Sequence, residues 1–84
     1  MRMNLLIAAS RTEGMEIQKH FPQFRKHILL TPKSLRSGVL VGEYVWTPGA
    51  LELPARLRMK IRGVLAPMID EESVEETFPV TLLT

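Results

Sequence analysis

The sequence predicts a small α/β domain, a three-stranded parallel sheet with two helices. Residues 4–9 read as a strand in which residues 5–9 form a continuous apolar run, typical of a strand covered on both faces at the centre of a parallel sheet. Two later β-like segments each end in a Thr-Pro pair, Thr31-Pro32 and Thr47-Pro48. The segments between these strands are helical or long enough to cross the sheet, as parallel strands require.

The first strand leads directly into a short helix. Ser10 and Glu13 form the Ser-x-x-Glu pattern of a capping box, which predicts that a helix begins here, and Pro22 ends it. The residues that face the sheet are spaced three and four apart: Gly14, Ile17 and Phe21. Because glycine lowers helix stability, Gly14 indicates a close approach between this helix and the sheet.

The second and third strands are joined by a connection without a clear helix. We expect strands at residues 27–30 and 43–47, separated by residues 31–42. Residues 39–41 extend the third strand in one interpretation, whereas Gly42 indicates a bulge or a turn. With right-handed connections, this order of elements is that of a reduced doubly wound, Rossmann-like unit. The first strand is the most apolar, so we place it in the middle, in the order 2-1-3.

The second helix, predicted over residues 53–66, has two uncharged faces. Pro54 lies in its first turn, where proline is tolerated. The face directed at the sheet is apolar: Leu53, Leu57, Ile61, Val64, Leu65 and Met68. Basic residues flank that face, Arg56 and Lys60 on one side and Arg58 and Arg62 on the other. The opposite face is small and apolar instead of charged: Ala55, Met59, Gly63 and Ala66.

This outer face predicts a docking surface for another helix. Small residues let helix backbones come close, and methionine adapts to irregular contacts. In its specific version, this hypothesis predicts a homo-oligomer: a dimer in which the second helices of two chains pack antiparallel across a two-fold axis. Two other interpretations stay open: the C-terminal tail covers this face, or the face has no role.

Length and composition exclude several classes of protein. With 84 residues, 24% charged and 45% hydrophobic, the chain fits one small domain (1–69) and a tail (70–84). It has no cysteine, so disulfides, thiolate zinc sites and cysteine nucleophiles are excluded. Because no apolar run approaches the ~20 residues of a membrane span, and the start is unlike a signal peptide, we expect a cytoplasmic protein.

The net charge of +2 hides an asymmetry. Residues 1–63 hold all eleven Lys and Arg against four acids, whereas residues 64–84 hold five acids and no base. We expect the tail either to lie back on the basic body or to be an acidic appendage beside a nucleic-acid-binding face. Its apolar half, 77–83, suits an edge strand or an extended binding segment, and we expect Phe78, Val80 and Leu82 to be its interaction residues. A loose terminus is the alternative.

The patterns of common enzymes and cofactor-binding proteins are missing. The turn after the first strand, residues 8–14, has one glycine and no lysine, unlike a phosphate-binding loop, and the G-x-G-x-x-G dinucleotide pattern does not occur. Glu16 and His20 are four residues apart, but a third metal ligand has no clear source. Ser10 is not in a G-x-S-x-G elbow. We therefore expect no catalytic residues, metal or cofactor, and a protein that is not an enzyme.

The loops after the three strands bring hydroxyl and basic side chains to one edge of the sheet, where ligands of such folds bind. An anion, a nucleotide phosphate or a nucleic-acid backbone suits this set: Ser10, Arg11, Thr12, Thr31, Lys33, Ser34 and Thr47. The alternative is that the hydroxyls and prolines only cap helices and shape turns. Nucleic acid is a further possible partner, because Arg25, Lys26, Lys33 and Arg36, with the basic residues of the second helix, could meet phosphates. Against this, stacking aromatics are few and the acidic tail competes.

The run from Asn4 to Ala66 resembles a set of very small Rossmann-like proteins encoded by actinobacterial phages. The resemblance lies in a strand that ends in Leu29-Leu30-Thr31-Pro32, and in a strand that leads through Gly49-Ala50 to a helix start at Leu53-Pro54. It covers about three quarters of the chain. It implies the fold, and it implies no activity and no site residues.

We therefore expect a non-enzymatic, homo-oligomeric protein-interaction module, a phage accessory protein that acts on a host or phage protein in the host cytoplasm. The second hypothesis is a binder of an anion, a nucleotide or a nucleic acid at the strand-end loops. A third is a degenerate nucleotide-binding domain that senses without hydrolysis. No membrane partner is expected.

Overall fold

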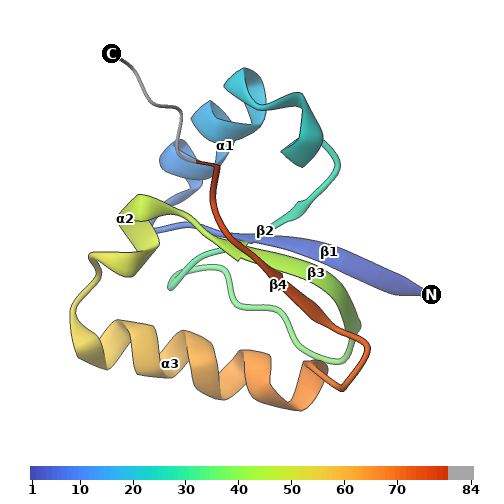
Figure 1. Ribbon diagram of the computed structural model, residues 1–84. Helices are drawn as coiled ribbons and strands as arrows, with labels where there is room; N and C mark the ends of the chain where they lie inside the picture. Colours follow the sequence, from blue (N-terminus) through green and yellow to red (C-terminus); the bar gives the residue numbers. More distant parts are fainter. Residues whose placement is uncertain (80–84) are drawn as a thin grey trace.

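The computed structural model describes residues 1–79 as an α/β fold, with helices on both faces of one four-stranded sheet (Figure 1). The strands are β1 (Arg2–Ile7), β2 (Ile28–Leu30), β3 (Leu40–Trp46) and β4 (Val74–Glu76). The helices are α1 (Arg11–His20), α2 (Pro48–Leu51) and α3 (Ala55–Leu65), with short 3-10 turns η1 (Pro22–Phe24) and η2 (Ala66–Met68). α1 covers one face of the sheet and α3 the other.

All strand pairs are parallel, in the order β2-β1-β3-β4. This confirms the predicted parallel α/β sheet, with the first strand between the second and the third. Leu5, Leu6 and Ile7 of β1 are fully buried and pair with β2 on one side and β3 on the other. The apolar run therefore forms an internal strand, as its composition predicts.

A β-bulge in β3 explains the glycine at position 42. One residue of β1, Asn4, stands opposite two residues of β3, Gly42 and Glu43. The Asn4 Oδ1 accepts a hydrogen bond of 2.9 Å from the Glu43 N–H, and a Cβ on Gly42 would lie 2.9 Å from the same oxygen. β3 thus begins at Leu40, before the predicted start at residue 43, and runs through the bulge.

Two apolar clusters form the core, one on each face of the sheet. The α3 face holds Leu5, Ile7, Leu30, Val41, Trp46, Ala50, Ile61, Leu65 and Met68. The α1 face holds a smaller cluster, Leu6, Phe24 and Val45, packed against half-buried Ile17, Phe21, Leu29 and Phe78. The predicted inner face of the second helix is confirmed, because its members are buried or half-buried.

Gly14 allows α1 to lie close to β2. The residue is buried, and a Cβ built on it would lie 2.6 Å from the Cδ2 of Leu29. The close approach that the sequence predicts is therefore a contact with a β2 side chain.

The second helical segment is divided in two. Thr47 caps a separate short helix, α2, by accepting a hydrogen bond of 3.1 Å from the Ala50 N–H, and Pro48 occupies its first position. α3 then begins at Ala55, two residues after the predicted start. The Thr-Pro pair at the end of β3 is therefore a helix start as well as a strand end.

The acidic segment of the tail, and not its apolar segment, forms the edge strand. β4 pairs with β3 through Val74, Glu75 and Glu76. The prediction that the tail supplies an edge strand is confirmed, but its position differs: residues 77–79 have no strand pairing, and 80–84 lie outside the described residues. The reason lies in the turn before β4, which brings the chain alongside β3 as early as Val74.

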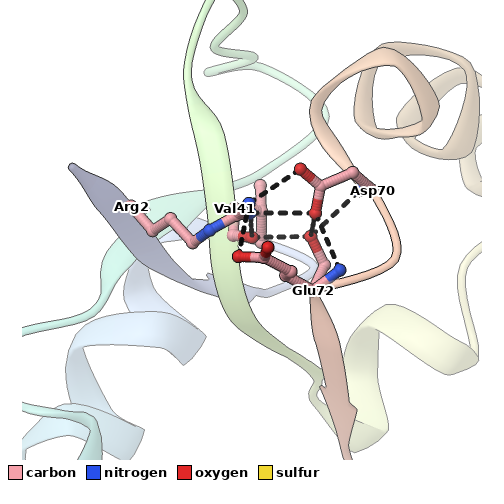
Figure 2. A network of polar contacts seen from close by, with 5 residues as sticks. Arg2, Val41, Asp70 and Glu72 are labelled. Carbon is pink, nitrogen blue, oxygen red and sulfur yellow. Dashed lines mark hydrogen bonds and ion pairs between the residues drawn. The ribbon is translucent and has the colours of Figure 1, made fainter.

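An arginine-centred network holds this turn (Figure 2). The Arg2 guanidinium donates to both carboxylate oxygens of Asp70, at 2.9 and 2.7 Å, to Glu72 at 3.2 Å and to the Val41 carbonyl at 3.0 Å. The Ser73 hydroxyl donates to the same Val41 carbonyl at 2.6 Å. The network therefore joins the start of β4 to both β1 and β3, and the tail lies back on the body of the protein.

The substitution Asp70→Asn should destabilise the fold at neutral pH but not in acid. Hydrogen bonds from Arg2 hold the pKa of the Asp70 carboxyl below its usual 3.8. Because the folded-state pKa is the lower one, this stabilisation is present above about pH 4 and is lost as the pH falls through the folded value. We expect the variant to have a lower thermal midpoint than the parent at about pH 7, and the same midpoint once the pH lies below the folded pKa of Asp70.

Glu71→Gln is the matched control, because Glu71 is exposed and makes no ion pair among residues 1–79. It should leave the midpoint unchanged at both pH values. If the thermal midpoint of Asp70→Asn stayed below that of the parent in acid, this would contradict the stabilising role of the ionised carboxylate.

Candidate functional site

The carboxylate of Glu13 joins the carboxyl ends of β1 and β3. Its Oε1 accepts hydrogen bonds from the Ala9 N–H and the Thr47 hydroxyl, both at 2.8 Å, and its Oε2 accepts one from the Gly49 N–H at 2.8 Å. Ala9 follows β1, whereas Thr47 and Gly49 belong to the start of α2 after β3. This arrangement, termed the Glu13 clasp, ties α1 to the ends of both inner strands.

The Glu13 clasp fills the place where this type of sheet binds anions. In the strand order 2-1-3, the chain from β1 runs over one face of the sheet toward β2, and the chain then reaches β3 on the other side of β1. The strand order therefore reverses between β1 and β3, and ligands of such folds bind in the crevice at that point. The peptide N–H and hydroxyl groups that would attract an anion there are bound to the chain's own carboxylate. Thr47 is fully buried and committed to Glu13, which removes it from the predicted anion-binding set.

The capping box predicted at this position is only half formed. The Ser10 Oγ accepts a hydrogen bond of 3.1 Å from the Glu13 N–H, as expected. The Glu13 side chain, which in a full box would accept from the N-cap N–H, instead reaches Ala9 and α2. Sequence reasoning missed this long-range role, because the Ser-x-x-Glu pattern already accounts for a glutamate at position 13 as a capping-box residue.

A cavity of about 400 Å³ lies on the other side of β1, between the loops after β1 and β2 and the first part of α3. Five of the seven predicted anion-binding residues line it: Ser10, Arg11, Thr31, Lys33 and Ser34. The rest of the lining is apolar: Ala9, Pro32, Leu53 and Leu57. This space is termed the strand-end cavity. Thr12 is exposed in the first turn of α1 and does not line it.

A tight turn positions Lys33 at the rim of the strand-end cavity. The Ser34 N–H donates to the Thr31 carbonyl at 3.0 Å and the Thr31 N–H donates to the Ser34 carbonyl at 3.3 Å. Pro32 and Lys33 therefore form the tip of the turn, with Thr31 buried beneath them and Lys33 exposed. The lysine side chain lies beside the cavity while its ammonium group stays in water.

Arg11 lies between the strand-end cavity and a second hollow of about 220 Å³, lined also by Arg36, Ile28 and Leu29. Thr31 and Ser34 line both spaces. Neither lining contains an acidic residue, and the three cations make no ion pair within residues 1–79. A group of unneutralised cations around a partly apolar hollow raises the local concentration of anions.

A larger hollow of about 530 Å³ lies at the ends of β3 and β4, lined by Trp46, Leu51 and Phe78 among others. Two carboxylates, those of Glu75 and Glu76, also line it. Their charge makes this hollow unsuited to an anion.

The predicted interaction residues fall in three different places. Ala55, Met59, Gly63 and Ala66 are all exposed on the outer face of α3, with Met59 70% exposed. The described part of the tail runs along β3 and toward the α1 face, so it leaves this outer face open (Figure 1). Docking of a partner there, and with it the homo-oligomer, stays a prediction.

Phe78 packs against the chain's own core, so this predicted interaction residue contacts its own chain. Its ring lies 5.3 Å from that of Phe21 and 5.8 Å from that of Phe24, centroid to centroid. These contacts bury its apolar surface against the α1 face. Val80 and Leu82 lie outside the described residues.

Two kinds of site find no support in the part of the chain that the structure describes. No three His, Asp or Glu side chains gather there as metal ligands. None of the helices in this part combines the length and the apolar character needed to cross a bilayer.

Removal of the Glu13 carboxylate should destabilise the protein. The variant Glu13→Ala leaves three hydrogen-bond donors without their acceptor, including the buried Thr47 hydroxyl, and we expect a loss of about 1–3 kcal/mol in the free energy of unfolding, measured with urea. Glu16→Ala, on the exposed side of the same helix, should change it by less than about 0.5 kcal/mol. Equal losses in the two variants would show that the clasp contributes nothing.

Two glycine substitutions should have opposite effects. A Cβ on Gly49 would collide with the Glu13 carboxylate, so Gly49→Ala should lower the free energy of unfolding by about 1–3 kcal/mol. Gly63 in α3 has open space at its Cβ position, so Gly63→Ala should raise it by about 0.5–1 kcal/mol. Urea unfolding measures both, and a neutral Gly49→Ala would mean that the carboxylate is not held in place.

The chain was also compared with known proteins. No protein-family model, curated protein or solved structure matches it. The resemblance to small Rossmann-like phage proteins, and a host or phage partner, therefore stay predictions.

Proposed function

We propose that this chain is a non-catalytic binding module for a small phosphate-bearing ligand in the strand-end cavity. The supporting observation is that two cations and three hydroxyl groups, from two loops separated by helix α1 in the sequence, line one cavity that has no acidic residue. Phosphate oxygens are bound by guanidinium, ammonium and hydroxyl donors of this kind.

The two halves of the cavity suit the two parts of a phosphate ester. Arg11 and Ser10 at the start of α1 and Ser34 in the turn after β2 supply donors for the phosphate. Leu53, Leu57 and Pro32 supply an apolar surface for the organic part, such as a planar base. The volume of about 400 Å³ falls within the range of ~300–1,000 Å³ found for small-molecule sites.

The Glu13 clasp explains why the ligand would lie beside the crevice and not in it. The donors between β1 and β3 already bind the carboxylate of Glu13. On the β2 side of β1, the guanidinium of Arg11 and the ammonium of Lys33 make no ion pair within the described chain. At this edge of the sheet, an incoming phosphate would therefore meet unneutralised cations on the β2 side of β1.

Titration with inorganic phosphate and with adenosine 5′-monophosphate, followed by amide NMR shifts, tests this proposal. We expect shifts at residues 10–12 and 31–34 for both probes, and tighter binding of the nucleotide because it also covers Leu53 and Leu57. The double variant Arg11→Ala/Lys33→Ala should weaken binding about tenfold or more, since each lost charge-assisted contact is worth about 1 kcal/mol or more.

Lys19→Ala/Arg25→Ala is the matched control, because it removes one lysine and one arginine from exposed positions outside the cavity lining. It should leave the affinity unchanged. Absence of shifts at residues 10–12, or equal losses in the two double variants, would overturn the proposed function.

A further inference from the structure

Helix α3 carries two rows of cations on either side of an uncharged crest. At about 100° per residue, residues four apart share a flank, which places Arg56 with Lys60 and Arg58 with Arg62. Between the two rows lie Ala55, Met59 and Gly63, all exposed. This surface is termed the basic ridge, and Figure 1 shows α3 as the outermost element on its side of the sheet.

The cations of the basic ridge are not neutralised by the protein. Among residues 1–79 the ion pairs join Arg2 to Asp70 and to Glu72, and none involves α3. Residues 53–69 contain no acid. The tail that was expected to compete for the basic body thus engages Arg2 of β1.

One row of the ridge is held in place by neighbouring groups. The Arg62 guanidinium lies 4.7 Å from the centre of the Trp46 ring, and the Arg58 Nε donates to the Leu53 carbonyl at 3.0 Å. Side chains that are already ordered lose less entropy when they bind a charged partner.

Glu75 of β4 lines a hollow together with one cation of the basic ridge. Glu75 and Arg62 line the same hollow of about 180 Å³ beside Tyr44, without an ion pair within the described residues. Burial raises the pKa of Tyr44, and the Glu75 carboxylate raises it further while Arg62 lowers it. Glu75 therefore moderates the field at Arg62, and none of the other three cations of the ridge lines that hollow.

Charge decides between the possible occupants of this surface. A second copy of the chain, packed antiparallel on α3, would place four cations against four cations with no acid between them. Duplex DNA instead presents two phosphate strands on either side of a major groove about 12 Å wide, which admits an α-helix. Two rows of cations flanking a narrow crest match that arrangement.

We infer that α3 lies in the major groove of double-stranded DNA, with its two rows of cations on the phosphates of the two strands. The crest side chains have no hydrogen-bonding groups to read base edges, so the binding tolerates different sequences. Gly63 and Ala55 allow a close approach, and Met59 supplies an apolar contact. This inference does not depend on a ligand in the strand-end cavity.

Fluorescence anisotropy of a labelled duplex of about 20 base pairs, over a series of salt concentrations, tests the inference. Arg56→Ala/Lys60→Ala should weaken binding at least tenfold at about 50 mM salt. It should also reduce the slope of log affinity against log salt by about 1.8, because each lost phosphate contact accounts for about 0.9. Met59→Glu, which places a carboxylate on the exposed crest, should weaken binding similarly without changing the thermal midpoint.

Two double variants with the same charge change are the controls, Lys19→Ala/Arg25→Ala on the α1 side and Arg11→Ala/Lys33→Ala at the strand-end cavity. Both should reduce the affinity less than the ridge variant and leave the contact at α3 intact. A single-stranded DNA with the same number of phosphates should bind more weakly, since it has no groove.

The inference is overturned if either control weakens binding as much as the ridge variant, or if the single strand binds as tightly as the duplex. It is also overturned if about 200 μM protein shows no binding at about 50 mM salt, since non-specific DNA binding is at least this strong for proteins that use such contacts. A dimer in sedimentation that Met59→Glu converts to a monomer would assign the surface to a second copy.

Discussion

The hydrogen bonds of the Glu13 carboxylate determine how the carboxyl edge of the sheet is built. One side chain from α1 binds the peptide after β1 and the first turn of α2 after β3. Because both oxygens are engaged, the two inner strands and two helices have a fixed relation at this edge. The crevice of the fold is closed by that carboxylate, and the open space is displaced to the β2 side, where Ser10 and Arg11 meet the turn at Thr31 and Ser34.

Local patterns in the sequence predict most of the fold but little of how its parts meet. The apolar run of β1, the cap at Ser10 and the apolar spacing of α3 each arise from neighbouring residues, so periodicity and capping rules find them. Two of the three partners of the Glu13 carboxylate, Thr47 and Gly49, lie more than thirty positions away, and such contacts leave no spacing signal. Five of the seven residues expected at the candidate site do line one cavity, because parallel strands end at one edge whatever the details. Thr47 was misassigned because a buried hydroxyl and an accessible one look alike in a sequence.

Acidic and basic residues have different tasks in this molecule. Glu13 and Asp70 hold elements together and are hydrogen-bonded to groups of the same chain. Of the basic residues, Arg2 alone is ion-paired within residues 1–79, although Arg58 and Arg62 contact Leu53 and Trp46 of the same chain. The asymmetry of charge along the sequence therefore becomes a separation in space, with the acids of the tail at the β4 edge and the cations around the strand-end cavity and on α3. A partner that is itself anionic is attracted to those two regions and repelled from the third.

The acidic composition of β4 has a consequence for the behaviour of the protein at high concentration. An outermost strand exposes unpaired peptide groups that can recruit a strand of another molecule, and this is a common start of edge-to-edge aggregation. Val74, Glu75 and Glu76 are all exposed, and the two successive glutamates point to opposite sides of the sheet. If the β4 strands of two molecules came together, their glutamate carboxylates would face one another on both faces of the sheet. Strand β4 thus adds to the sheet and also opposes its growth at this edge.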